Sequence, residues 1–208
     1  GWRRMRRAEP NRAHYALAEL EQLGAISGVI TQNVDGLHAR AGSSNLLALH
    51  GDLSRIVCLD CGRDEGRESL DARLDAANPG YLDRLEGRDL RVNPDGDVEL
   101  DDRYIRDFQM VPCLNCGSTR LKPDVVYFGE SVPAERKARK DAMLAECSAL
   151  LVVGSSVAVM SSYKIVLEAL RAGKPVAIIN GGPGRADAKA TYLWRSGVGE
   201  ALELMLDA

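Results

Sequence analysis

Long apolar runs are missing from this sequence of 208 residues. No stretch approaches the roughly 18 consecutive apolar residues that a membrane-spanning helix needs. The first residues also lack the apolar core and small-residue cleavage site of a secretory signal peptide. These absences predict a cytoplasmic protein with no membrane partner.

A large excess of charge of one sign is missing as well. The formal net charge is −3, whereas nucleic-acid-binding domains are usually strongly basic. Four arginines do cluster near the start, at Arg3, Arg4, Arg6 and Arg7. We interpret them as a solvated helix face, and we expect no nucleic-acid partner.

Internal repeats and low-complexity segments are also absent. Hydrophobic residues make up 45% and charged residues 27% of the chain, close to the average for soluble domains. The composition therefore predicts a folded globular protein, with one large domain or one medium domain plus a small module.

Short β-branched runs alternate with helical patterns along the chain. The runs typical of buried parallel strands are residues 28–31, 124–128, 149–154 and 175–180. Apolar spacing predicts helices over residues 11–23, 133–146, 161–172 and 199–208. The alternation predicts an α/β fold with a Rossmann-like, doubly wound parallel sheet.

Residues 62–112 interrupt this rhythm. The segment is rich in acidic residues and contains turn signals at Pro79-Gly80 and Pro94-Asp95-Gly96. It lies between two Cys-x-x-Cys pairs, which predicts a small inserted module closed at its base. We therefore assign residues 1–57 and 117–208 to the Rossmann-like domain and residues 58–116 to a zinc-binding module.

The two cysteine pairs, Cys58 with Cys61 and Cys113 with Cys116, carry the strongest signal in the sequence. Each pair can bring two thiolates to one side of a tetrahedral ion, and the glycine after each pair suits a tight turn. Structural zinc is the preferred ligand, with rubredoxin-like iron, a redox dithiol pair and unmetallated cysteines as alternatives. Four thiolates would leave the zinc no open position for chemistry. Cys147, the fifth cysteine, is interpreted as a small core side chain.

Polar side chains follow several of the predicted strands. The first strand runs into Gln32-Asn33-Val34-Asp35, and His50 follows an apolar segment. Gly154-Ser155-Ser156 and Asn180-Gly181-Gly182 follow two later strands. Open α/β sheets bind ligands at the carboxyl ends of their strands. Alternatively, Asn33 and Asp35 shape a turn, His50 is structural and the glycines only allow tight turns. Neither glycine stretch makes a G-x-G-x-x-G fingerprint.

In combination, these features resemble the sirtuin family of NAD-dependent protein lysine deacylases. The motifs that carry the resemblance are Pro10-Asn11-x-x-His14, the run from Thr31 to His38, Leu49-His50-Gly51, both cysteine pairs, the run from Lys122 to Glu130, Gly154-Ser155-Ser156 and Ile178-Ile179-Asn180. They cover nearly the whole chain. Residues 95–98 and 150–156 are most similar to the mitochondrial sirtuin 4-like branch and its bacterial relatives. The resemblance implies a cytoplasmic location in a bacterium and a mitochondrial one in a eukaryote.

The resemblance implies specific roles for individual residues. His50 would be the catalytic base, acting with Asn33 and Asp35 in a site that binds the nicotinamide ribose of NAD. The other contacts to NAD would come from Gln32, Val34, Gly154, Ser155, Ser156, Asn180, Gly181, Gly182 and Val198. The acyl-lysine of a protein substrate would lie beside Val126, Phe128 and Gly129. The acyl group would pass to ADP-ribose as nicotinamide leaves, and protein ADP-ribosyl transfer would be a second activity.

The start of the sequence departs from the family pattern. Residues 1–11 match neither the family's Gly-Ala-Gly-x-Ser loop nor its Gly-Ile-Pro-Asp-[FY]-Arg stretch. From this departure we expect a truncated gene product. The alternative function is an inactive fragment that only binds acyl-lysine peptides. A zinc-ribbon module that binds nucleic acid is a third reading, and the acidic insertion argues against it.

Overall fold

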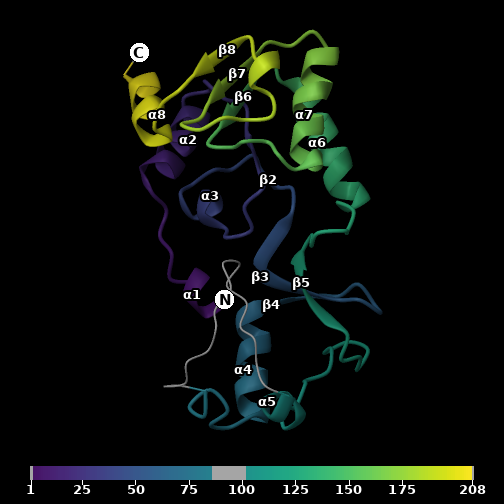
Figure 1. Ribbon diagram of the computed structural model, residues 1–208. Coiled ribbons are helices and arrows are strands. Elements are labelled where there is room, and N and C mark those ends of the chain that lie inside the picture. The colour runs from purple at the N-terminus through teal and green to yellow at the C-terminus, as the bar shows by residue number, and fades with distance from the viewer. Residues whose placement is uncertain (1, 86–101, 208) are drawn as a thin grey trace. The chain divides into compact units, whose positions relative to one another are not determined.

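A computed structural model describes residues 2–85 and 102–207 of the chain (Figure 1). The chain divides into two compact units. Residues 1–8 and 51–125 form one, which we call the cysteine unit, and residues 9–50 and 126–208 form the other, which we call the larger unit. The predicted turn at Pro94-Asp95-Gly96 and the motif at residues 95–98 lie outside the described residues.

The larger unit contains only parallel strand pairs among its described residues. Strand β1 (Val29–Thr31) pairs with β2 (Leu46–Ala48). Strand β7 (Val176–Ile179) lies between β6 (Leu150–Val153) and β8 (Tyr192–Trp194). Parallel strands need crossover connections, and here the crossovers are helical. This arrangement confirms the predicted α/β class.

Helices cover both faces of the β6-β7-β8 sheet (Figure 1). Helices α6 (Ala134–Glu146) and α7 (Met160–Arg171) pack on one face, where Val152 and Ile178 meet Val166. Helices α2 (Arg12–Gln22) and α8 (Val198–Leu206) pack together on the other, against Val153. Because successive strand residues point to opposite faces, Val152 and Val153 enter different cores. The short helix α3 (Leu37–Arg40) and a 3₁₀ turn (Asp187–Lys189) complete this unit.

Sequence signals account for the start and end of α2. The Asn11 side chain accepts hydrogen bonds from the backbone N–H groups of Ala13 and His14, and the His14 ring accepts one from Asn11 N–H. This reciprocal cap satisfies N–H groups that have no partner within the helix. Gly24 then leaves the helix with φ of 74°, a conformation that other residues rarely adopt.

The cysteine unit is built on an antiparallel sheet. Strand β3 (Gly51–Cys58) lies between β4 (Asp64–Gly66) and β5 (Leu121–Val125). Helix α4 (Arg67–Ala77) covers the sheet through Leu70, which packs with Ile56 and Val111. Helices α1 (Trp2–Met5) and α5 (Asp102–Arg106) are short.

Two sequence-based expectations differ from this structure. The prediction of a buried parallel strand over residues 124–128 was wrong, because β5 ends at Val125, runs antiparallel to β3 and is followed by exposed Tyr127 and Phe128. The cysteine unit also extends beyond residues 58–116, because β3 and β5 pair as far as Gly51 and Val125. Within residues 2–85 and 102–207, no helix has both the length and the hydropathy to cross a membrane.

Candidate active site and metal centre

The four paired cysteines converge on one point in the cysteine unit. Their sulfur atoms all lie within 4.8 Å of one another. The Sγ atoms of Cys58 and Cys116 are 3.6 Å apart, and those of Cys61 and Cys113 are 3.8 Å apart. A tetrahedral zinc ion with Zn–S bonds of about 2.3 Å separates its ligands by roughly 3.8 Å. The cluster therefore fits a zinc site.

Backbone geometry forms the two halves of this centre in the same way. Gly62 N–H donates to Cys58 O at 2.9 Å, and Gly117 N–H donates to Cys113 O at 3.0 Å. Both glycines have positive φ, 72° and 74°, which closes each turn so that its two thiols point the same way.

The four thiols affect one another's ionisation in opposite directions. Backbone hydrogen bonding at Arg63 is the main cause that lowers the pKa of Cys61 to about 6. The Ser118 backbone lowers the pKa of Cys116, but hydrogen bonds with Cys61, burial and the other thiols raise it to about 12. Since four thiolates repel one another, a bound metal ion would supply the charge that lets all four ionise.

Polar side chains gather at the carboxyl ends of the strands in the larger unit. Gln32 follows β1 and Ser155 follows β6, and Gln32 Nε2 donates to Ser155 Oγ at 3.0 Å. Ser155 Oγ also accepts from Val157 N–H at 3.1 Å. Val157 has φ of 44°, the one positive φ of a non-glycine residue in the described chain. For a β-branched residue this conformation is strained, and strain of this kind is concentrated at functional sites.

Asp35 is held in a tight turn after β1. Its Oδ1 accepts from Leu37 N–H at 3.0 Å, and Gly36 between them has φ of 72°. The rings of His14 and His38 lie near this turn, with centroids 4.6 Å apart. Burial and the proximity of His14 lower the pKa of His38, although the Asp35 charge opposes this shift.

His50 lies two residues beyond β2. Leu49 N–H donates to Thr31 O at 2.9 Å, which extends the pairing of β1 and β2 up to the histidine. The His50 ring is half-buried, and its Nε2 lies 2.8 Å from Ser161 Oγ at the start of α7. Burial lowers the pKa of His50 below its ordinary 6.5, a backbone hydrogen bond with Gln32 raises it, and the charge of Arg136 lowers it again. The net direction is downward, so the ring is neutral at pH 7.

The remaining predicted nucleotide contacts follow β6 and β7 or begin α8. Gly154 has φ of 61° and lies against Val198, since a Cβ at Gly154 would be 3.2 Å from Val198 Cγ2. Asn180 Nδ2 donates to Gly182 O at 2.8 Å, which folds the Asn180-Gly181-Gly182 turn on itself. Gly181 and Gly182 are exposed, as a backbone that contacts a ligand must be.

The predicted substrate residues lie in the exposed loop after residue 125. Val126 N–H donates to His50 O at 2.8 Å, so the start of this loop is bonded to the backbone of the histidine. The Phe128 side chain is 98% exposed, and Gly129 has φ of 91°. Tyr127 beside Phe128 is also exposed, so the loop presents two adjacent aromatic side chains on the surface.

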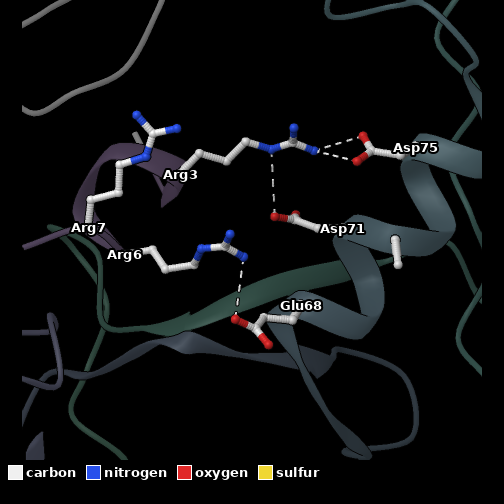
Figure 2. Close-up of a pocket in the computed structure, with 7 residues that line it drawn as sticks. Arg3, Arg6, Arg7, Glu68, Asp71 and Asp75 are labelled. Atoms are coloured by element: carbon white, nitrogen blue, oxygen red, sulfur yellow. Dashed lines mark hydrogen bonds and ion pairs between the residues drawn. The ribbon is translucent and has the colours of Figure 1, made fainter.

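A separate hollow of about 310 Å³ lies in the cysteine unit (Figure 2). Arg3 donates to both Asp75 carboxylate oxygens at 2.7 Å, and Arg6 lies 3.4 Å from Glu68. Figure 2 shows Arg3 reaching from α1, and Arg6 from the turn after it, to α4. Arginine and carboxylate side chains pair with one another on its walls, and most of them are exposed, so this hollow fits an ion-paired surface contact. None of the predicted site residues lines it.

Sequence reasoning missed Ser161 and the pair of His14 and His38. His14 and His38 belong to motifs that we quoted, but their spacing along the chain gives no sign that the rings meet. Ser161 is 111 residues from His50, and its contact depends on where α7 packs. Only the three-dimensional fold brings these groups together.

Together, the parallel sheets, the polar strand ends and the four-cysteine cluster define an α/β protein with a site that fits zinc. The Sir2 family model matches residues 2–161. The chain therefore belongs to the Sir2 family, the NAD-dependent protein deacylases.

The relatives agree with this assignment. NAD-dependent protein deacetylase 1 of Corynebacterium efficiens is 62% identical over 208 residues, which cover all of this chain and 74% of that protein. The human mitochondrial NAD-dependent protein lipoamidase sirtuin-4 is 42% identical over 205 residues, covering 99% of this chain and 64% of that protein. The expected similarity to sirtuin 4-like and bacterial sirtuins is confirmed.

Solved structures give the same result. A structure of Sir2 bound to acetylated peptide aligns with a TM-score of 0.73 at 28% identity, covering 98% of this chain and 72% of that one. A second, of Sir2Tm bound to a propionylated peptide, aligns with a TM-score of 0.72 at 29% identity, covering 98% and 73%. The sirtuin fold and the NAD-dependent deacylase family are thus shown, and the alternative of an inactive peptide-binding fragment is not favoured.

Proposed function

We propose that this chain transfers an acyl group from a protein lysine to the ADP-ribose part of NAD, with His50 as the general base. The observation that carries the assignment is the position of His50 beyond the pairing of β1 and β2, with Nε2 hydrogen-bonded to Ser161. A neutral imidazole can accept a proton from a sugar hydroxyl, and the lowered pKa of His50 keeps it neutral at pH 7.

Gln32, Asn33, Val34 and Asp35 form the part of the site that would surround the nicotinamide ribose. NAD supplies the electrophilic sugar carbon and the leaving nicotinamide. Positive charge develops at that carbon, and the Asp35 carboxylate with the amides of Gln32 and Asn33 would stabilise it. The bond from Gln32 to Ser155 and the turn around Asp35 hold these groups in place before the nucleotide binds.

The adenosine half of NAD would bind at the ends of β6 and β7. The residues proposed for this part are Gly154, Ser155, Ser156, Asn180, Gly181, Gly182 and Val198. Glycines here let the backbone approach the ligand, and hydroxyl and amide groups offer hydrogen bonds to ribose and phosphate oxygens.

The acyl-lysine would lie beside Val126, Phe128 and Gly129. The bond from Val126 N–H to His50 O links this loop to the base. An extended peptide could pair with loop backbone as an added strand. Two solved relatives carry acetylated and propionylated peptides, which supports acylated proteins as substrates. Protein ADP-ribosyl transfer would use the same site with a different acceptor.

Release of nicotinamide tests this function. Purified chain is mixed with NAD and an acetyl-lysine peptide, and free nicotinamide and deacylated peptide are measured by chromatography. We expect His50→Ala and the closer-sized His50→Asn to lose about 10² to 10⁴-fold in turnover, the usual contribution of a general base. Zinc content and melting temperature should stay unchanged in both variants.

Two results would contradict the proposal in different ways. If His50→Ala deacylates at the unmodified rate, His50 is not the base. If the unmodified chain binds the peptide with no nicotinamide release, the chain acts only as a peptide-binding module.

A further inference from the structure

Among the described residues, Ser161 is the side-chain hydrogen-bond partner of the His50 ring, and the function proposed above gives Ser161 no role of its own. Ser161 Oγ lies 2.8 Å from His50 Nε2, within the normal range for an O–H to nitrogen bond. Both side chains are half-buried. Both residues belong to the larger unit, so their separation is set within one compact body.

The other ring nitrogen of His50 has a different neighbour. A backbone hydrogen bond with Gln32 raises the pKa of His50, which is the effect of an acceptor on an imidazole. The only backbone acceptor of Gln32 is its carbonyl oxygen. With Nε2 facing Ser161, Nδ1 is the nitrogen that remains to donate to this carbonyl. A neutral imidazole that donates through Nδ1 must accept through Nε2, and the Ser161 hydroxyl is then the donor.

Ser161 is fixed by its place at the start of α7. The neighbouring Ser162 hydroxyl donates to Val159 O at 2.8 Å, which braces the first turn of the helix. One turn further on, Ile165 and Val166 are buried in the core against the sheet. Because core packing and the first-turn bond both hold the helix, the Ser161 Oγ atom stays beside the histidine, while its O–H bond is free to rotate.

We propose that Ser161 is a positioning residue for His50. Its hydroxyl donates to the single lone pair of Nε2 in the empty site and so selects the tautomer with the proton on Nδ1, and it gives up that lone pair when a sugar hydroxyl of NAD takes its place. This role rests on the proposed function of His50 as the base. When the sugar hydroxyl donates its proton to Nε2, the ring becomes an imidazolium. The Ser161 hydroxyl has by then rotated away from the lone pair, and its oxygen can accept from the new N–H, so the same partner contacts the ring in both protonation states.

The tautomer of His50 is the direct readout. The sequence contains only three histidines, His14, His38 and His50, so a ¹⁵N-labelled imidazole spectrum is simple, and its His50 signals are identified by their loss in His50→Ala. In the unmodified chain we expect one tautomer, with the proton on Nδ1. Ser161→Ala should give a mixture of tautomers, whereas Ser161→Thr, which keeps the hydroxyl, should restore the single form.

Kinetics provide the second readout. Ser161→Ala should lower kcat/KM for an acetyl-lysine peptide about tenfold, the scale of one hydrogen bond, with the fall in kcat and not in the peptide KM. Ser162→Ala is the matched control, because it removes a hydroxyl from the same turn of α7 without contacting His50. It should leave the tautomer unchanged. A melting curve for each variant checks that α7 is intact.

The proposal is overturned if Ser161→Ala keeps both the single tautomer and the unmodified kcat/KM. It is also overturned if Ser162→Ala alters the tautomer as strongly, since the effect would then come from the helix turn. Failure of the base assignment is separable: His50→Ala would retain turnover, while the tautomer spectrum would still report whether Ser161 holds the ring.

Discussion

Gly117 closes the turn that brings Cys113 and Cys116 together, with φ of 74°. A Cβ added there would meet nothing within 4 Å, so a substitution acts through the backbone alone. We expect Gly117→Ala to destabilise the protein by about 1 to 2 kcal/mol, the cost of the left-handed conformation for an ordinary residue. Urea unfolding and competition with a zinc chelator would measure the loss of stability and of metal affinity.

Gly117→Asn is the matched control for this prediction, because asparagine tolerates the left-handed conformation better than alanine. Its unfolding free energy should fall between those of the unmodified chain and of Gly117→Ala. Equal stability of the alanine variant and the unmodified chain would show that the turn does not require this conformation.

For single residues, the sequence predicted which residues belong to a site better than it predicted which side chains contact one another. The Cys-x-x-Cys spacing anticipated the cluster because two short turns suffice to build it. Gln32 and Ser155 were both expected among the contacts to NAD, and the structure joins them by a hydrogen bond. Ser161 could not be anticipated, since its contact with His50 depends on the packing of α7 and not on any local pattern.

At the scale of the elements, the carboxyl-terminal end of helix α6 is bound by the side chain of Lys174. Lys174 lies just before β7, and its Nζ donates to the carbonyl oxygens of Leu144, Ala145 and Cys147. The last carbonyls of a helix have no partners within it, and a cation there also interacts favourably with the helix dipole. One lysine thus satisfies the carboxyl-terminal end of α6 and ties it to the following strand.

Lys174→Met should therefore destabilise the chain by about 1 to 3 kcal/mol, because half-buried carbonyl groups lose their donor. Lys137→Met is the control, since Lys137 is exposed on the same helix and surface substitutions usually change stability by less than about 0.5 kcal/mol. Equilibrium urea unfolding of both variants would decide. Equal stability of the two would mean that water replaces the ammonium without cost.

Helices were predicted more accurately than strands. The apolar spacing anticipated α6, α7 and α8 to within one or two residues at their described ends, because each has one apolar face. Strand β3 carries Asp52, Ser54 and Arg55 and has no clean apolar run, so its pairing was not foreseen. Because β3 was missing from the prediction, its partner, the apolar run of residues 124–128, was assigned to the parallel sheet in error. Periodicity does not reveal which strand another strand pairs with.

On the scale of the whole molecule, the metal centre and the polar strand ends belong to different compact units. The four cysteines lie in the cysteine unit, whereas Gln32, Asp35, His50 and Ser155 lie in the larger unit. A zinc ion with four thiolate ligands has no open coordination position. The fold thus supports a structural role for the metal and leaves the chemistry to the residues of the larger unit.

All three histidines respond to acid in the same direction. Burial is the main cause that lowers the pKa values of His14, His38 and His50 from the ordinary 6.5. The folded chain therefore holds them neutral at a pH where the unfolded chain protonates them. Because the unfolded state then binds more protons than the folded state, the fraction of unfolded chain rises as the pH falls.

We expect the free energy of unfolding to decrease as the pH falls below 6.5, before most carboxylates titrate.

A second loss of stability should follow at lower pH, where two carboxylates titrate. Hydrogen bonds from Asn45 and Ser44 lower the pKa of Glu21 below 4.5 although burial opposes them, and Gly184 and Arg195 lower that of Asp187 below 3.8. A depressed carboxylate pKa contributes stability above the unfolded value, and that stability disappears as the pH falls through the folded value.

Urea unfolding at a series of pH values from 7 to 4.5 would measure the first loss. His38→Gln is the informative variant, because His38 Nδ1 is buried with no hydrogen-bond partner among the described residues. A glutamine carries no titrating group, so the dependence on pH below 6.5 should become shallower. A stability curve that stays flat from 6.5 to 4.5 would contradict the predicted burial of neutral histidines. If the unfolding free energy of His38→Gln changes with pH as steeply as that of the unmodified chain, the loss of stability comes from His14 and His50 instead.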